Sequence, residues 1–281
     1  MLDAMATIEQ LTPDERAVRA GAGLVDRSER GKLALTGADA KAFLHGQVTN
    51  DVEGLSPGRG CYAALLTNKG KMLGDLRVLD AGDELLLDTE RVALQALFTR
   101  IHRSKIGHEV ELHRRTLERG LLSLVGPRAR AVLGDAAAAL GGDEHDHVAA
   151  ELDGIPVRLV ATDVGVDLLV AAERTAALAR ALEARGARPV PEAVAEVVRV
   201  ERGRPRYGVD LDDTTIPQEA GLNERAVSFG KGCYVGQETV ARLYYKGKPN
   251  RHLRGLRLSA PVPSGTELRL GERPVGRLGS S

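Results

Sequence analysis

Residues 61–79, CYAALLTNKGKMLGDLRVL, decide the fold class of this 281-residue chain. Two apolar runs, 61–66 and 72–79, flank residues 67–71, TNKGK, whose composition is typical of a turn. Strand-length apolar runs joined by such a short turn predict a β-hairpin. The hairpin argues against an all-helical protein.

The segments on either side of this hairpin add both strands and helices. Residues 31–37 alternate between apolar and polar side chains, which predicts a strand that ends in glycine. Residues 84–87 predict a further strand, and residues 92–102 have the periodicity of an amphipathic helix. The first part of the chain is therefore expected to be α+β.

A second block of alternating elements begins near Leu121. Its order of strand, helix, strand, strand and helix suggests a small ferredoxin-like unit. The expected elements are a strand at 121–127, an Ala-rich helix to Leu140, a polar loop at 141–148, strands at 155–161 and 166–170, and a helix through Ala184.

The last third of the chain changes character twice. Residues 193–201 predict a helix, and a Gly/Pro-rich irregular segment follows it. From Leu253 onward three short strands are expected, in LRGLRLS, TELRL and PVGRLGSS, as the start of an all-β module. Three strands alone leave unpaired edges, which proteins normally cover. This module is therefore expected to be incomplete.

The composition excludes several classes of protein. Lys plus Arg and Asp plus Glu both number 39, so the net charge is zero and extensive phosphate contacts with nucleic acid are not expected. The two cysteines form no CxxC motif, so we expect no metal site or iron–sulfur cluster held by this chain alone. No apolar run is long enough to span a membrane, and the first residues lack a secretory signal. We therefore expect a cytoplasmic protein.

Residues 231–239, KGCYVGQET, carry the clearest chemical signal. Cys233 follows Lys231 by two residues and precedes a helix-compatible run. A nearby ammonium and a helix N-terminus both favour the thiolate and so raise reactivity. The alternative is a buried structural cysteine at a tight turn, because cysteine is often simply buried. The residues alone do not decide between the two.

A carboxylate at a helix end provides the second signal. Glu201 closes the predicted helix and precedes the Gly/Pro-rich loop at 202–210. There it can accept two parallel N–H bonds from a flat, amidine-like edge such as that of a pterin. The alternative is a surface glutamate paired with a neighbouring arginine, which is the more common situation for a charged residue.

Two further acidic features remain. Asp75 lies in the middle of a predicted strand, where aspartate is disfavoured, so function or a local hydrogen bond is expected to hold it there. Residues 143–147, DEHDH, contain possible metal ligands. Their loop setting favours a solvated acidic loop instead.

Together these clusters resemble the YgfZ family, the folate-binding relatives of the glycine cleavage T protein. The match with KGCYVGQE at 231–238 is the most specific, because this signature separates YgfZ-type proteins from T proteins. Three further stretches support it: LHGQVTND at 44–51, LTNKGKMLGDLRV at 66–78 and IPQEAGLNE at 216–224. The resemblance extends from about Gly23 to Gly279.

The resemblance implies a multi-part α+β fold around a folate site. Residues 1–118 would form the N-terminal part of the folate-binding domain, and residues 119–190 the ferredoxin-like subdomain. Residues 191–248 would return to the folate site, and residues 249–281 would begin a truncated C-terminal β-barrel.

The resemblance also assigns roles to individual residues. Glu201 corresponds to the pterin-contacting glutamate of T proteins, and Cys233 to the essential cysteine of the YgfZ family. Asp75 is the single acid where T proteins carry a pair; it would line the folate site and act with Cys233 and Lys231 in any chemistry. The rest of the signature would lie around the cofactor: Tyr234, Gly236, Gln237 and Glu238.

The expected function is that of a tetrahydrofolate-binding accessory protein for the maturation or repair of iron–sulfur proteins, linked to tRNA-modifying enzymes. Its partners would be iron–sulfur enzymes or assembly proteins. One alternative is an aminomethyltransferase-like transferase that uses tetrahydrofolate in one-carbon transfer. Another is a non-catalytic module that binds folate or tRNA, although zero net charge and few aromatic residues weigh against direct RNA binding. Whether the chain is itself an enzyme is left open.

Overall fold

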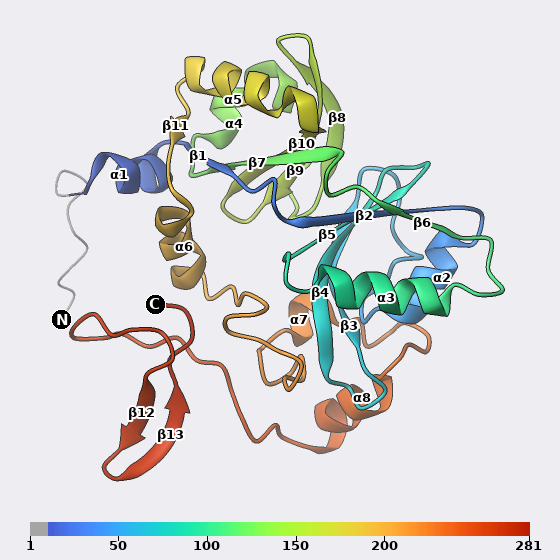
Figure 1. Cartoon of the computed structure of the whole chain (residues 1–281). Coiled ribbons are helices and arrows are strands. Elements are labelled where there is room, and N and C mark those ends of the chain that lie inside the picture. Colours follow the sequence, from blue (N-terminus) through green and yellow to red (C-terminus); the bar gives the residue numbers. More distant parts are fainter. Residues whose placement is uncertain (1–10) are drawn as a thin grey trace.

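The computed structural model describes residues 11–281, in which two large sheets lie next to each other (Figure 1). The five-stranded sheet has the strand order β3-β4-β5-β2-β6. Its strands are β2 (Gly31–Thr36), β3 (Gly60–Leu66), β4 (Met72–Asp80), β5 (Leu85–Thr89) and β6 (Glu111–Arg114). All of its pairings are antiparallel, and β3 and β4 form the hairpin predicted from the sequence.

The five-stranded sheet is apolar on one face. Helices α2 (Ala40–Gln47) and α3 (Leu94–Ser104) add Phe43, Leu97 and Ile101 to the same core as the leucines of its strands. Gly74 on β4 permits this packing, because an added Cβ would lie 2.4 Å from the side chain of Leu97. The periodicity over 92–102 therefore identified a genuine core helix.

The six-stranded sheet has the order β11-β1-β7-β10-β9-β8. Its strands are β1 (Gly23–Asp26), β7 (Arg119–Val125), β8 (His147–Leu152), β9 (Ile155–Thr162), β10 (Gly165–Ala171) and β11 (Arg188–Pro189). A second core lies against it, to which helices α4 (Ala129–Leu133) and α5 (Thr175–Ala184) contribute Leu133, Leu178 and Leu182.

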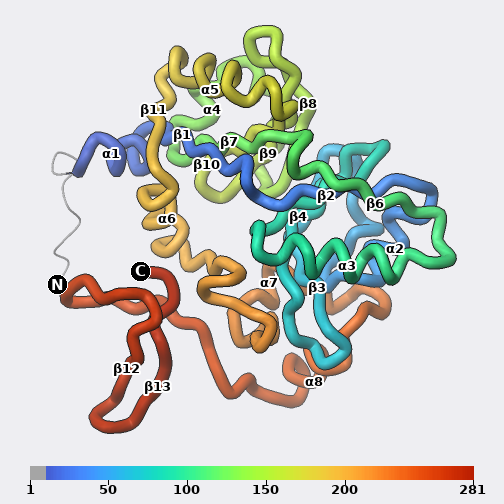
Figure 2. The backbone as a smooth tube through the Cα atoms, viewed as in Figure 1, coloured from blue at the N-terminus to red at the C-terminus, as the bar shows by residue number. Residues whose placement is uncertain are grey.

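A third, smaller core joins the start of the chain to its middle. Helix α1 (Pro13–Ala20) packs against α6 (Glu192–Glu201), and Val18 and Ala195 are buried there beside Val25 of β1. The chain then continues through α7 (Asn223–Ala226) and α8 (Gln237–Lys246) to the hairpin of β12 (Glu267–Leu270) and β13 (Arg273–Arg277). This hairpin projects away from both large sheets (Figure 2).

The α+β class is confirmed, and three local expectations are corrected. The loop expected at 141–148 runs into an additional strand, β8, which pairs with β9 along its length. The Ala-rich helix ends at Leu133 and continues only as a 3-10 turn over Gly134–Ala137. LRGLRLS is not a strand, because residues 253–259 pair with no other strand in the described part of the chain.

Candidate functional site

The second face of the five-stranded sheet is polar and carries the candidate site. Tyr62 lies opposite Arg77, and Arg77 lies opposite Asp88, so all three side chains point to one side of the sheet. Asp75 is two residues before Arg77 on β4 and shares this face. The alternation that buries leucine on one face thus places a tyrosine and three charged groups on the other.

Asp75 is buried and held by a tyrosine. The hydroxyl of Tyr62 donates to Asp75 Oδ2 at 2.6 Å, and Thr89 Oγ1 donates to the Asp75 carbonyl oxygen at 2.6 Å. Burial raises the pKa of Asp75 to about 6, against the opposing effects of the Tyr62 hydrogen bond and the Arg30 charge. The sequence predicted a hydrogen bond or a function for this residue, and the structure shows the hydrogen bond.

A group of charged residues from distant segments is linked to Tyr62 through Arg225. The guanidinium of Arg225 lies 5.0 Å from the Tyr62 ring centroid and donates to Glu144 at 2.5 Å. Arg204 reaches Glu144 at 3.4 Å and Asp163 at 2.7 Å. Ion pairs therefore link residues from four parts of the chain into one wall, which contacts Tyr62 through Arg225.

His145 belongs to this wall and was not anticipated. Residues 143–147 were expected to be a solvated loop, yet His145, Asp146 and His147 are all buried. His145 has a left-handed backbone with φ of 75°, and its Nδ1 is buried without a hydrogen-bond partner. Burial, together with the charges of Arg77 and Arg225, lowers the pKa of His145 to about 3. Within residues 11–281, no cluster of side chains has the geometry of a metal site.

An ion network links this wall to the other sheet. Arg77 donates to Asp167 of β10 at 2.6 Å and also pairs with Asp88. Burial raises the pKa of Asp88, but Arg30 and Arg77 outweigh that effect and hold its pKa at about 2. Ser123 of β7 donates to Asp167 at 2.6 Å. The two polar sheet faces are therefore joined by charge-assisted hydrogen bonds, which are stronger than neutral ones.

Glu201 lies at the C-terminal end of α6 and is exposed. Its carboxylate accepts a hydrogen bond from Arg19 of α1 at 2.6 Å, and half of the side chain is open to solvent. Among the described residues, no hydrogen bond or ion pair joins Glu201 to Asp75. The surface pairing considered from the sequence is therefore present, but the partner is a distant arginine rather than a sequence neighbour.

Lys231, in the KGCYVGQE motif, connects this motif to the end of α2. Its ammonium donates to the carbonyl oxygens of His45 and Val48, at the end of α2, the second at 2.7 Å. Burial lowers the pKa of Lys231 to about 8, while Asp51 opposes this shift. The end of α2 is therefore tied to a segment more than 180 residues later in the sequence.

Tyr234 and Gly236 fix the motif against the β3–β4 turn. Tyr234 is buried in the first core, and burial raises its pKa to about 12. Gly236 has φ of 85°, and an added Cβ would lie 2.5 Å from the carbonyl oxygen of Thr67. Gln237 and Glu238 follow as the first residues of α8, half-buried and exposed respectively.

Cys233 lies between Lys231 and Tyr234 in this motif. Its thiol is free and its side chain is exposed, so the buried structural cysteine considered from the sequence is excluded. Cys61 of β3 is half-buried, and burial raises the pKa of its thiol to about 12. The two cysteines therefore differ sharply in their access to solvent and to reagents.

Gly236→Ala is expected to destabilise the fold by about 1–3 kcal/mol, because a left-handed residue and a backbone clash are both introduced. Chemical denaturation measures the change. Gly221→Ala is the matched control, since Gly221 has φ of 69° but no atom within 4 Å of an added Cβ. Gly221→Ala therefore measures only the free-energy cost of a left-handed alanine. Equal losses of unfolding free energy in the two variants would show that the contact with Thr67 does not matter.

Comparison with known proteins identifies the family. Residues 6–231 match the family described as the GCVT N-terminal domain. The chain belongs to this family. The GCVT-family match covers the polar sheet face and ends at Lys231, just before Cys233.

Individual relatives agree with this assignment. The GCVT-family chain is 32% identical to an aminomethyltransferase of Geobacillus kaustophilus, over 85% of this chain and 68% of the relative. It is 29% identical to a putative chloroplastic transferase of Arabidopsis thaliana, over 97% of this chain and 65% of the relative. The chain therefore spans about two thirds of the length of these relatives.

A solved structure confirms the fold. The glycine cleavage system aminomethyltransferase T from Bartonella henselae superposes with a TM-score of 0.81 at 25% identity, covering 95% of this chain and 76% of the other. The GCVT-family chain thus has the mixed α/β fold of an aminomethyltransferase. Residues 11–281 form no closed barrel and contain no helix long and apolar enough to cross a membrane.

Proposed function

We propose that this GCVT-family protein binds tetrahydrofolate or a one-carbon derivative of it, and serves the maturation or repair of iron–sulfur enzymes, including enzymes that modify tRNA. One observation carries the proposal: the Cys233 thiol is exposed, although the motif residues on both sides of it are anchored to the fold. The anchors are the hydrogen bonds of Lys231, the buried ring of Tyr234 and the close backbone contact of Gly236. A signature built only for stability would not need an exposed cysteine at its centre. A membership in the YgfZ branch of the family would explain it.

The residues of the polar face suit a folate. Asp75 offers a buried carboxyl, Tyr62 an aromatic ring, and His145 a buried nitrogen that lacks a partner. A pterin carries N–H donors and a flat ring, so carboxylates and aromatic side chains can bind it. Tetrahydrofolate would supply the nitrogen atoms that carry a one-carbon unit, while these side chains would orient the ring.

Glu201 can leave its ion pair with Arg19 and bind a folate at a small cost in free energy. Its ion pair with Arg19 has side-chain exposures of 50% and 36%, and an ion pair this exposed contributes at most about 1 kcal/mol. Charge-assisted hydrogen bonds from a pterin edge would contribute about 1.5–3 kcal/mol. A folate that reaches Glu201 would therefore displace Arg19.

A single exposed cysteine implies that a partner protein supplies the remaining ligands of any cluster. One thiolate cannot hold an iron–sulfur cluster, which is usually held by four cysteines. Cys233 would instead act on, or transiently ligate, a cluster or sulfur species whose other ligands come from an iron–sulfur enzyme or assembly protein. The cytoplasm would be the compartment of this encounter, since it keeps the thiol reduced.

A second function is favoured by one specific observation. Asp75 is buried beside Tyr62 with a pKa of about 6, which suits a group that exchanges protons near neutral pH. The chain would then be an aminomethyltransferase-like enzyme that transfers a one-carbon unit to tetrahydrofolate. Asp75 would hold or accept the proton of the reacting amine.

Complementation tests the main proposal against this alternative. In a strain that lacks the chain, wild-type protein is expected to restore the activity of iron–sulfur enzymes without changing their amounts. Purified protein is expected to release no formaldehyde or methylenetetrahydrofolate from methylamine donors. Turnover with a donor, together with unrestored iron–sulfur enzymes, would replace the main proposal by the transferase.

A further inference from the structure

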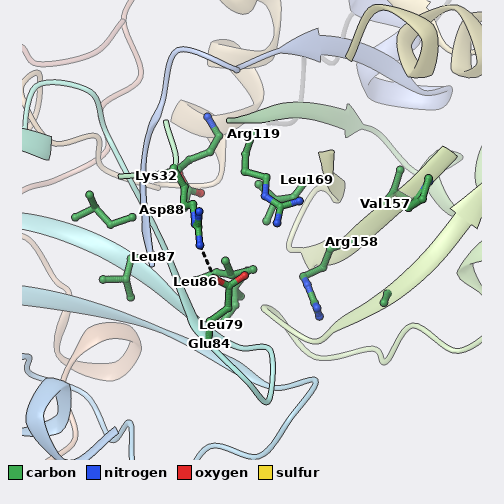
Figure 3. A pocket seen from close by; sticks show the side chains of 14 residues that line it. Lys32, Leu79, Glu84, Leu86, Leu87, Asp88, Arg119, Val157, Arg158 and Leu169 are labelled. Carbon is green, nitrogen blue, oxygen red and sulfur yellow. Dashed lines mark ion pairs between the residues drawn. The ribbon is translucent and has the colours of Figure 1, made fainter. Parts of the chain in front are cut away.

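A cavity of about 180 Å³ lies between the two sheets. Its apolar lining comes from both of them: Leu79 and Leu86 belong to the five-stranded sheet, and Val157 and Leu169 to the six-stranded one (Figure 3). Neither Asp75, Glu201 nor any residue of the KGCYVGQE motif lines it. It is smaller than the sites that hold drug-sized ligands, which measure about 300–1,000 Å³.

The charged side chains around this cavity are unbalanced. Four are basic and two are acidic: Lys32, Arg115, Arg119, Arg158, Glu84 and Asp88. Asp88 is already neutralised by Arg30 at 2.9 Å and by Arg77 at 2.8 Å. Glu84 pairs with Arg115 at 3.7 Å. Two arginines, Arg119 and Arg158, are therefore left without a carboxylate within 4 Å in the described chain.

Arg119 and Arg158 share one face of the six-stranded sheet. Arg119 of β7 lies opposite Ala171 of β10, and Arg158 of β9 lies opposite Leu169 of β10. Because Leu169 and Ala171 are two residues apart, both arginines point to the same side. Figure 3 shows Arg119 close to Leu169 and Arg158 farther along the same sheet, among the residues that line the cavity. Burial lowers the pKa of Arg158; the charges of Asp83 and Glu84 oppose this shift, and the like charge of Arg119 adds to it.

Buried neighbours hold Arg158 in place. Arg158 Nη1 donates to Nδ1 of His147 at 3.0 Å, and Nε2 of His147 lies 3.2 Å from the Arg59 carbonyl oxygen. These two contacts require the neutral ring with its proton on Nε2. Burial lowers the pKa of His147, with Arg158 adding to the effect, so the neutral ring is favoured. The guanidinium is thus positioned before any ligand arrives.

The cavity wall also contains an unsatisfied donor. Nε of Arg115 is buried and has no hydrogen-bond partner. Buried donors are almost always paired, and each exception calls for an explanation such as an absent ligand or ion. The Nε atom itself has almost no contact with solvent, so it is not part of the cavity surface.

We propose that this cavity binds a small organic anion, a carboxylate attached to a compact apolar body. The carboxylate lies between Arg119 and Arg158, where a guanidinium pair can bind it through charge-assisted hydrogen bonds. The apolar body lies against Leu79, Leu86 and Leu169. This site is separate from the proposed folate site and does not depend on it.

Calorimetric titration at low salt with three probes tests the proposal: benzoate, neutral benzamide, and inorganic phosphate as an anion without an apolar body. Benzoate is expected to bind wild type at one saturable site, and the other two at least about tenfold more weakly, because each lacks one of the two required features. No saturable benzoate binding to wild type, or equally tight binding of benzamide or phosphate, would overturn the proposal.

Variants locate the site. Arg119→Gln and Arg158→Gln are each expected to weaken benzoate binding about tenfold or more. The side chain of Arg119 is exposed, so Arg119→Gln tests the claim even if Arg158→Gln does not fold. Arg103→Gln, an exposed arginine of α3 away from the cavity, is the control and is expected to bind as wild type does. An equal loss in Arg103→Gln, or no loss in Arg119→Gln, would contradict the assignment.

Discussion

Cys233→Ser is expected to fold, to bind tetrahydrofolate as wild type does, and to leave iron–sulfur enzymes inactive in a strain that lacks the chain. The side chain of Cys233 is exposed and contributes no buried contact, so its oxygen analogue should not change the fold. Serine cannot supply a thiolate, which is the nucleophile and the metal ligand in cysteine chemistry. The measurement is the activity of client iron–sulfur enzymes, with protein level and Tm recorded alongside.

Cys61→Ser is the matched control, since it removes the other thiol of the chain. Cys61 is half-buried, and burial raises the pKa of its thiol to about 12, so little thiolate forms there near neutral pH. We expect Cys61→Ser to restore the enzymes as wild type does. Full rescue by Cys233→Ser, or failure of Cys61→Ser alone, would contradict the assignment of the reactive thiol to Cys233.

Asp75→Asn is expected to gain stability relative to wild type as pH rises from 4 to 7. The folded-state pKa of Asp75 is about 6, above its ordinary value of 3.8. The native state therefore binds more protons than the unfolded chain between these values, and wild-type stability falls as pH rises through this window. The difference amounts to about 3 kcal/mol at most. Denaturation curves of both proteins at several pH values measure it.

Asp88→Asn provides the opposite control on the neighbouring strand. The pKa of Asp88 is held at about 2, so this carboxylate is ionised in both states between pH 5 and 7. Its replacement should cost a constant free energy over that range, with the loss shrinking only as pH falls below 4. A flat difference for Asp75→Asn from pH 4 to 7 would show that Asp75 does not have a raised pKa.

Local patterns predicted the elements well where burial dominates. The hairpin at 61–79, the helix at 92–102 and the helix ending at Glu201 are all present, because each has a regular apolar face that packs on a core. β8 was missed, since its residues 148–151 are mostly small or polar and only the pairing with β9 makes them a strand. The same long-range context buries His145, which local charge alone suggested would be solvated.

The candidate site was predicted in part. Asp75 stood out because aspartate is unusual in the middle of a strand, but its partner Tyr62 is thirteen positions away on the paired strand and carries no local signal. The KGCYVGQE motif was recognised, but the structural roles of Lys231 and Gly236 were not. Lys231 contacts the end of α2 and Gly236 contacts the β3–β4 turn, and both partners are distant in the sequence. Arg19, the partner of Glu201, comes from a helix more than 180 residues earlier and could not be anticipated from sequence spacing.

The most direct test of the account is the calorimetric titration of tetrahydrofolate into wild type, Glu201→Gln and Arg19→Gln; the chain contains no tryptophan to report binding by fluorescence. We expect one saturable site, weakened by about 1.5–3 kcal/mol in Glu201→Gln. Arg19→Gln should bind at least as tightly as wild type, because it frees the Glu201 carboxylate. A folded wild type that binds no tetrahydrofolate would contradict the central claim. Equal weakening in both variants would instead show that Glu201 matters only for its contact with α1.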